Sequence, residues 1–485
     1  MCCFIWLSGS FGSVPFHSIR ISVLQRGPYV SDVRDFGAKG DGETDDTSAI
    51  QKTLEAGDGV LSFPRGDYLI SRSIEVDLNR IGRVGIEGGV GTAKVVMAGP
   101  GPAFHLQGSH ERSADPGQFD PGIWSGERLP TVHNLEIEGR HPEADGFLVE
   151  GTMQSTFEGT LLRTLRDGIR IHDRARNVLI SHCHIYDNSG CGIHLDHVNL
   201  HQIIVTGSHI SYCRRGGIKV EGSQIRNLQV TGNDIEYNYD QDAECSADVW
   251  IDSSDEAATV REGTIVSNTI QAVQSPGGAN VRIIGHDSVN NKAGQFTISD
   301  NLIGTQEDNI RLANCRGIVM NGNVIYGAGK RNLVVQGSRN IILTGNSFDH
   351  NPDYNKGELC TGLKFEDSQD CTISACNIHD AETEGAESER RAIVEFYRCR
   401  RVNMSGCQIL NGSPVGIYLD DVTDSSITGC SVLEDRELKT MQSSVIWSGS
   451  GTGNLMANNR LADGARGAVQ VEEAVDVTQA SNLIA

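Results

Sequence analysis

The sequence is poor in several features that mark other protein classes. It has no run of about 18 apolar residues, the length that a membrane-spanning helix needs. Lys and Arg number 41 against 63 Asp and Glu, and the net charge of -22 disfavours binding to nucleic acid or an anionic membrane. Only 7 Met stand against 56 Gly, which favours short strands and tight turns over helices. We therefore expect an all-β protein that binds neither nucleic acid nor membrane.

The 13 cysteines lack the spacing of a metal site. No CxxC pair of the zinc-binding kind is present. Cys183, Cys376, Cys407 and Cys430 instead share one position of a repeat, where a small buried thiol behaves as an apolar group. We therefore predict that most cysteines are core thiols.

That repeat is a six-residue pattern of apolar, Ser/Thr/Asn-like, small, Asn/Cys/Ser, any and apolar residues, as in ISHCHI and VTGNDI. In stacked coils such a position lies above its counterpart, and amide side chains there hydrogen-bond along the stack. The pattern predicts a right-handed parallel β-helix of about eleven or more coils. Its fourth position is occupied by Cys183, Ser208, Asn233, Asn268, Asn301, Asn323, Asn346, Cys376, Cys407 and Cys430.

A second short strand precedes each of these segments, with the form x-Gly-apolar-x-apolar-x, as in DGIRIH and CGIHLD. Because side chains alternate along a strand, the apolar pair is expected inside and the flanking residues outside. The predicted first outer column is Arg170, His194, Lys219, Trp250, Arg282, Arg311, Val334, Lys364, Glu395 and Tyr418. The second is His172, Asp196, Glu221, Asp252, Ile284, Ala313, Gln336, Glu366, Tyr397 and Asp420.

The segment that begins at Val33, VRDFGAKGDGETDDTSAIQKTLEAGDGVLSFPRGDYLI, resembles the opening of the pectate-lyase-like superfamily of β-helix proteins. Asp45, Asp46 and Thr47 would supply N-cap oxygens for a helix with Ile50 and Leu54 on one face. We expect that helix to cap the open end of the solenoid. The matching positions are Phe36, Gly37, Gly40, Asp41, Gly42, Asp45, Asp46, Thr47, Ala49, Ile50, Gln51, Pro64, Gly66 and Tyr68.

The chain is expected to fall into three parts. Residues 1–30 are a targeting or disordered extension, 31–130 hold the cap and first coils, and 131–485 hold the repeats. The opening MCCFIWLSGSFGSVPF is apolar but lacks a basic region and a clear cleavage site. We favour a secreted or periplasmic protein, and the oligomeric state stays open.

The outer columns are densest in titratable groups over three coils, at His194 with Asp196, Lys219 with Glu221, and Trp250 with Asp252. Adjacent coils are about 4.8 Å apart, so these side chains are expected to lie within contact distance. An aromatic ring beside acids and bases suits a sugar, whereas a solvated charged face is the structural alternative. The bordering residues, predicted to bind substrate together with Trp250, are Arg170, His172, Arg311 and Tyr239.

The resemblance implies a polysaccharide as the partner but does not fix the reaction, because the superfamily includes lyases, glycoside hydrolases, epimerases, fructotransferases and phage tailspikes. Elimination would need a base and a group that neutralises a uronic acid, either Ca²⁺ or Arg. Asp196, Glu221 and Asp252 could hold Ca²⁺. The candidate bases are Lys219, Arg282 and His194. Of these activities, we expect that of a polysaccharide lyase.

Two alternatives remain. A glycoside hydrolase or fructotransferase-like enzyme would use paired carboxylates, and Asp196 and Asp252 would lie about 9.6 Å apart, near the range of about 6.5 to 9.5 Å for inverting enzymes. The second alternative is a noncatalytic glycan-binding or tailspike-like protein. A second, lower-ranked patch comprises Asp353, Tyr354, Lys356, Lys364, Glu366 and Glu395.

Overall fold

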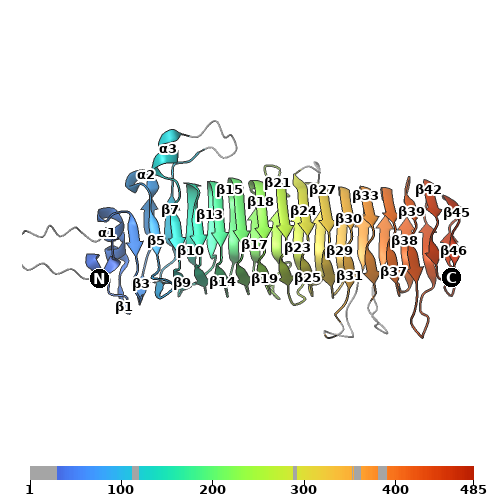
Figure 1. Ribbon diagram of the computed structural model, residues 1–485, viewed down its shortest axis with the longest axis horizontal. Coiled ribbons are helices and arrows are strands. Elements are labelled where there is room, and N and C mark those ends of the chain that lie inside the picture. The colour runs from blue at the N-terminus through green and yellow to red at the C-terminus, as the bar shows by residue number, and fades with distance from the viewer. Residues whose placement is uncertain (1–29, 112–119, 288–291, 352, 354–361, 381–389) are drawn as a thin grey trace, which may run out of the picture.

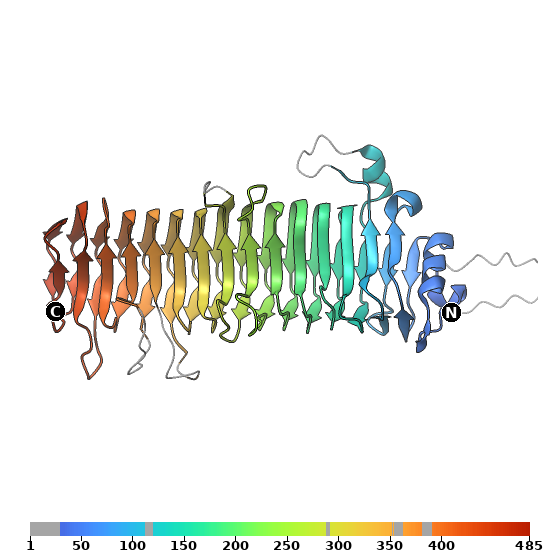
Figure 2. The ribbon, with the colours of Figure 1, turned by 180° about the vertical axis from the view of Figure 1, so that it is seen from behind.

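The computed structural model describes residues 30–111, 120–287, 292–351, 353, 362–380 and 390–485. These residues form an elongated stack of strands, with α1 (Thr47–Ala56) near one end of its long axis and β46 (Leu483–Ile484) at the other (Figure 1). Figure 2 shows the same stack from behind. Every strand pairing is parallel, which confirms the predicted parallel β-helix. The predicted extension over residues 1–30 lies, except for Val30, outside the described residues.

Each full coil presents three faces, numbered in chain order. The first carries the predicted outer columns, the second follows it, and the third lies after the ladder position. The third face is a single sheet in which each strand pairs with the corresponding strand of the next coil. Its 17 strands show that the stack exceeds the predicted minimum of about eleven coils. They are β1 (Asp41–Asp45), β3 (Gly66–Ile70), β6 (Ala93–Met97), β9 (Glu136–Gly139), β12 (Leu161–Arg163), β14 (His184–Tyr186), β16 (His209–Ser211), β19 (Asp234–Glu236), β22 (Thr269–Gln271), β25 (Leu302–Gly304), β28 (Val324–Tyr326), β31 (Ser347–Asp349), β34 (Asn377–His379), β37 (Gln408–Leu410), β40 (Ser431–Leu433), β43 (Arg460–Leu461) and β46 (Leu483–Ile484).

The first face carries the predicted outer columns. It belongs to a 29-stranded sheet together with the second face, because β13 and β15 run through both faces without a break. The first-face strands are β4 (Ile74–Asp77), β7 (Gly101–Gln107), β10 (Ala144–Met153), β13 (Ile169–Ser181), β15 (Cys191–Thr206), β17 (Gly216–Glu221), β20 (Ala247–Asp252), β23 (Ala279–Ile284), β26 (Asp308–Ala313), β29 (Arg331–Gln336), β32 (Leu363–Glu366), β35 (Val394–Tyr397), β38 (Val415–Asp420), β41 (Ser443–Ser448) and β44 (Val469–Val471).

The second face completes each coil and precedes the bend into the third face. Its strands are β2 (Val60–Ser62), β5 (Gly85–Glu87), β8 (Thr131–His133), β11 (Thr156–Glu158), the second halves of β13 and β15, β18 (Gln224–Thr231), β21 (Thr259–Val266), β24 (Ala293–Ser299), β27 (Cys315–Asn321), β30 (Arg339–Thr344), β33 (Gln369–Ser374), β36 (Arg400–Ser405), β39 (Ser426–Thr428), β42 (Gly451–Ala457) and β45 (Val475–Ala480).

Short helices lie near the N-terminal end (Figure 1). They are η1 (Val33–Phe36), α1 (Thr47–Ala56), α2 (Leu78–Ile81) and α3 (Pro121–Gly126). The buried side chains of Ile50 and Leu54 join α1 to the core, as predicted. The predicted role of Asp46 is wrong, because its carboxylate accepts from the backbone N–H groups of Lys39 and Gly40 and makes no cap bond to the helix. Among the described helices, none has the length and hydropathy to cross a membrane.

The predicted ladder lies at the bend between the second and third faces. Asn268 Nδ2 donates to Asn301 Oδ1 at 3.0 Å, and Asn301 Nδ2 donates to Asn323 Oδ1 at 3.0 Å. The backbone N–H of each asparagine also donates to the amide oxygen of the next coil, at 3.0 and 3.1 Å for these two pairs. Each amide thus satisfies buried backbone groups as well as its neighbour in the stack.

The cysteines at the ladder position lie in the core, as predicted. Cys183, Cys376, Cys407 and Cys430 are all buried and belong to the apolar cluster that runs from Val33 to Val475. All four are free thiols. They occupy the ladder position as small apolar groups, so the role of these four cysteines is to pack in the core.

Candidate functional site

The strand register brings the predicted site residues together on the first face. Along the first column, Arg170 pairs with His194, His194 with Lys219, Lys219 with Trp250, Trp250 with Arg282, and Arg282 with Arg311. Along the second, His172, Asp196, Glu221 and Asp252 follow one another in the same way. The predicted columns therefore hold residue for residue over β13 to β26.

Four residues at the centre of this face form a continuous chain of charge, which we call the charge chain: Asp167, His194, Glu221 and Lys219. His194 Nδ1 lies 3.1 Å from Asp167 Oδ2, and Nε2 lies 3.4 Å from Glu221 Oε2. Lys219 Nζ donates to the same Glu221 oxygen at 2.9 Å. Each cation thus contacts a carboxylate in the chain, and His194 lies between two of them.

These contacts shift the pKa values of His194 and Glu221 in opposite directions. Burial opposes a charged imidazole, but the contacts with Asp167 and Glu221 outweigh it and raise the pKa of His194 to about 9. The contact with His194, reinforced by Lys219 and opposed by burial, lowers the pKa of Glu221 to about 2. At neutral pH His194 is therefore an imidazolium between two carboxylates, and it becomes neutral only as the pH passes about 9.

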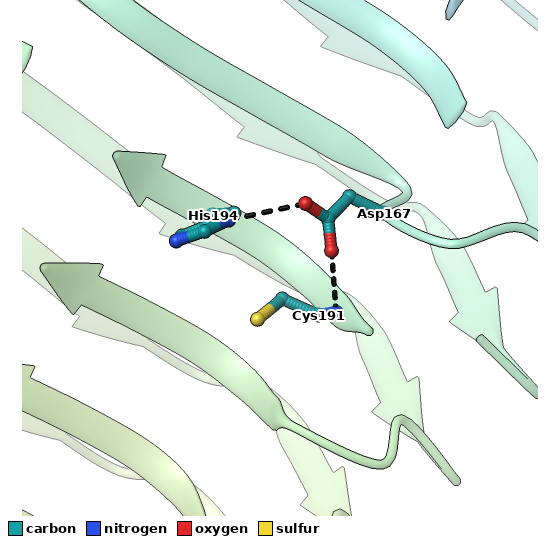
Figure 3. A group of neighbouring side chains, drawn as sticks. All are labelled: Asp167, Cys191 and His194. Atoms are coloured by element: carbon teal, nitrogen blue, oxygen red, sulfur yellow. Dashed lines mark hydrogen bonds and ion pairs between the residues drawn. The ribbon is translucent and has the colours of Figure 1, made fainter. Parts of the chain in front are cut away.

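Asp167 and Cys191 belong to this site but were not predicted from the sequence. Figure 3 shows the Asp167 carboxylate between the His194 ring and the backbone of Cys191. The Cys191 N–H donates to Asp167 Oδ1 at 2.7 Å. Burial raises the pKa of the Cys191 thiol well above its usual value, so the thiol is uncharged. Both residues directly precede the glycine of the x-Gly strand motif, which is the sequence signal that could have found them.

Asp196 lies beside the charge chain and has partners of its own. Its Oδ2 accepts from Arg170 Nε at 2.8 Å, and its Oδ1 lies 2.6 Å from His197 Nδ1. Burial opposes its charge, but these two contacts outweigh burial and lower the pKa of Asp196. The carboxylate is ionised and held toward the preceding coil.

The three carboxylates predicted to hold Ca²⁺ already have partners of their own in this structure. Ca²⁺ takes six to eight oxygen ligands, so it would have to share carboxylates with the cations that bind them. Asp196 is bound by Arg170, and Glu221 by Lys219. Asp252 instead bonds within its own turn, where Oδ1 accepts from the N–H and the hydroxyl of Ser254 at 3.0 and 2.6 Å. A calcium ion here would be surrounded by positive side chains.

Trp250 lies between cations of the two neighbouring coils. Lys219 Nζ is 4.7 Å and Arg282 Cζ is 5.6 Å from the centre of its ring, both within cation–π range. The predicted stacking of Trp250 on a sugar would therefore require one cation to move aside. Arg282 itself is buried, and burial, with the charge of Arg311 acting in the same direction, lowers the pKa of its guanidinium.

The remaining predicted residues lie around this centre. His172 Nδ1 lies 3.0 Å from Glu150 Oε1, and the other oxygen of Glu150 lies 2.8 Å from His105 Nε2. Arg311 Nη1 donates to Asp308 at 3.1 Å. Tyr239 is partly buried in the connection between β19 and β20. His172 and Arg311 thus flank the charge chain on opposite sides along the stack.

The second predicted patch centres on Glu395 of β35. Glu395 is buried, and its carboxylate accepts from Arg331 Nη2 at 2.8 Å and from the Tyr397 hydroxyl at 3.0 Å. Lys364 contacts Glu366 at 3.1 Å. The buried carboxylate is already neutralised by its own neighbours. Of the predicted loop residues, Asp353 is described, whereas Tyr354 and Lys356 lie outside the described residues.

Two protein-family models match most of the stack. The model described as "Right handed beta helix region" matches residues 123–288 and 249–432, which supports the predicted handedness. A second model, "Rhamnogalacturonase A/epimerase, pectate lyase-like", matches residues 30–94 and confirms the resemblance of the N-terminal segment.

Individual similar proteins are distant or matched only locally. Alginate lyase 7 of Azotobacter vinelandii is 54% identical over 43 residues, which are 8% of this chain and 5% of that protein. The pre-mature gene product 12 of bacteriophage phi29 is 13% identical, with a TM-score of 0.56, over 93% of this chain and 72% of that one. Tailspike protein 3 of bacteriophage CBA120 is 14% identical, with a TM-score of 0.37, over 94% of this chain and 59% of that one. The phi29 likeness shows the fold alone.

Proposed function

Because the chain belongs to the right-handed β-helix family and has a pectate-lyase-like opening, we propose that its first face binds an acidic polysaccharide and cleaves it by β-elimination. The observation that carries this proposal is a row of positive side chains along one outer column. Arg170, His194 and Lys219 follow on successive coils, and Arg282 and Arg311 continue the row beyond Trp250. In a chain of net charge -22 this row concentrates cations on one face, and an acidic substrate would compete for them with Asp196, Glu221 and Asp308, which contact Arg170, Lys219 and Arg311.

The cationic row supplies what elimination needs at a uronic acid. A base removes the proton beside the carboxylate, the bond to the leaving sugar oxygen breaks, and a double bond forms. The negative charge that develops on the carboxylate must be neutralised. Arg282 and Arg311, whose strand positions pair directly, are assigned to that role. A carboxylate bound between them would also relieve their mutual repulsion.

We assign the base to His194, one of the three bases predicted from the sequence. Asp167 contacts Nδ1 and so holds a proton there. Nε2 is buried and lies 3.4 Å from Glu221 Oε2, so it would accept the substrate proton only once the ring is neutral and the Glu221 carboxylate has moved aside. Lys219 is assigned as the acid that protonates the leaving oxygen, because its ammonium lies on the neighbouring coil and is 2.9 Å from Glu221. Glu221 holds both groups in place.

Calcium has no part in this scheme. Of the carboxylates that were predicted to bind it, Asp196 already contacts Arg170, and Glu221 already contacts His194 and Lys219. We therefore propose that protein cations alone neutralise the substrate carboxylate, and that elimination continues in the presence of a chelator.

The reaction is tested by incubating the full chain with a panel of acidic and neutral polysaccharides in the presence of EDTA. Elimination is expected on a polyuronate and gives unsaturated products that absorb in the ultraviolet. New reducing ends without that absorbance would instead show hydrolysis, for which Asp196 and Asp252 are the candidate carboxylates. Binding without either product would indicate a noncatalytic glycan-binding protein, and activity that EDTA abolishes would contradict the metal-free scheme.

The pH dependence of elimination tests the pairing of Asp167 with His194. The base must be neutral, so kcat/KM is expected to rise as the pH passes about 9 in the unchanged protein. In Asp167→Asn the carboxylate that favours the charged ring is gone, so the midpoint is expected to fall. The plateau should fall as well, because an amide nitrogen facing Nδ1 favours the ring form with its proton on Nε2.

Asp187→Asn is the matched control for this pH profile, since Asp187 is exposed in the connection from β14 to β15, the strand that holds His194. Its profile should match that of the unchanged protein. A midpoint that stays near 9 in Asp167→Asn would show that Asp167 does not set the pKa of His194.

A further inference from the structure

We propose that Asp349, His350 and His379 bind a divalent transition-metal ion of the zinc type at the edge of the third face. Asp349 ends β31, His379 ends β34, and His350 directly follows Asp349. The two strands pair on adjacent coils, so the three side chains meet at one place on the surface. This site shares no residue with the charge chain.

The donor atoms already have the spacing of a metal site. Asp349 Oδ1 lies 3.1 Å from His350 Nδ1 and 3.6 Å from His379 Nδ1, and one donor atom of each residue lies within 4.8 Å of the others. Ligands about 2.1 Å from a tetrahedral zinc ion are about 3.4 Å apart. The Asp349 oxygen is therefore near the separation from each ring nitrogen that zinc imposes, and the two nitrogens lie within 4.8 Å of each other.

The local hydrogen bonding leaves a nitrogen for the ion. His350 Nδ1 is buried and makes no hydrogen bond, although it lies close to Asp349. The carboxylate of Asp349 is oriented by the backbone N–H of His350, which donates to Oδ1 at 2.8 Å. The two imidazole rings are edge to face, with centres 5.5 Å apart. A cation between the three groups would use the unpaired nitrogen and balance the carboxylate.

The next shell of residues holds the His379 ring. Its Nε2 lies 3.4 Å from Asn411 Nδ2, and Asn411 is buried and exchanges two hydrogen bonds with Asp435, at 2.7 and 3.0 Å. Metal binding through Nδ1 places the ring proton of His379 on Nε2, so the long contact with Asn411 is expected to open.

The position of the site suggests what the ion does. The connection from β31 to β32 starts at Asp349, and the connection from β34 to β35 starts at His379. An ion bound here would join the starts of both connections across two coils. A metal that links two coils stabilises the folded stack, because it binds the folded chain and not the unfolded one.

The test uses the untagged full chain, freed of metal with a chelator and dialysed, and Zn²⁺ alone as the probe. Titration calorimetry is expected to show one tight site, and thermal unfolding should shift upward when Zn²⁺ is added. His350→Gln and His379→Gln are each expected to weaken binding at least tenfold and to remove the shift. Circular dichroism verifies that both variants keep the fold.

His209→Gln is the matched control, because His209 also lies on the third face and contacts one carboxylate, Asp234, at 3.0 Å. It should bind Zn²⁺ as the unchanged chain does. No saturable uptake, or equal uptake by His350→Gln and His379→Gln, would overturn the proposal. Uptake lost in His194→Gln instead would also overturn it, because the ion would then lie on the first face near Asp196 and Glu221.

Discussion

Replacing His194 by glutamine is expected to lower the rate of β-elimination by about 10²- to 10⁴-fold, the usual contribution of a positioned acid or base. Glutamine has a similar reach and can still hydrogen-bond Asp167, but it cannot take up a proton. The initial rate of ultraviolet absorbance on the best polyuronate, measured at pH values on both sides of 9, gives the effect. The remaining activity should no longer rise through that pH.

His182→Gln is the control for this substitution. His182 is 70% exposed, and its ion contact with Glu158 is long, at 4.0 Å, so its loss should leave the rate unchanged. If His194→Gln keeps full activity, the base lies elsewhere, and Lys219 is the next candidate. If the rate falls but still rises through pH 9, His194 holds the site together and another group takes the proton.

The residues that face outward on the first face could be predicted from the sequence, because the two-residue alternation along a strand and the repeat from coil to coil both apply there. Alternation along each strand selects the outward side chains, and the repeat aligns them from coil to coil. Arg170, His194 and Lys219 could therefore be placed in register without a structure. The same logic predicted the buried ladder of Asn268 and Asn301.

Side-chain pairing within the columns could not be predicted in this way. The register places Asp196 beside Glu221, and that suggested a calcium site with Asp252. In the structure Asp196 instead turns to Arg170 on the preceding coil. Rotamers and the nearest opposite charge decide such pairings, and neither is visible in the repeat.

Asp167 was missed because it precedes its strand, β13, and Cys191 was missed because it is the first residue of β15, where the alternation only begins. In a turn, alternation no longer indicates the direction of a side chain, so Asp167 had no assigned face. Asp167 nevertheless occupies the motif position directly before a glycine, Gly168, and Cys191 occupies the same position before Gly192. Turn residues in a solenoid stack as regularly as strand residues, and the contact between Asp167 and His194 results from that stacking.

Replacing Asn301 by alanine is expected to lower the free energy of unfolding by about 3 to 5 kcal/mol, because several buried groups lose their partners at once. The amide oxygen of Asn301 accepts from Asn268 N and Nδ2, both at 3.0 Å. Its Nδ2 donates to the carbonyl of Ile265 at 2.9 Å and to Asn323 Oδ1 at 3.0 Å. Each group left unsatisfied costs about 1 to 3 kcal/mol.

Urea-induced unfolding followed by circular dichroism measures this change, with Asn403→Ala as the control. Asn403 is an exposed asparagine of β36 that accepts one hydrogen bond from the Ser426 hydroxyl, at 2.9 Å. Its loss should change stability by about 0.5 kcal/mol or less. Equal urea midpoints for Asn301→Ala and Asn403→Ala would show that packing of the apolar core, and not the asparagine ladder, holds neighbouring coils together.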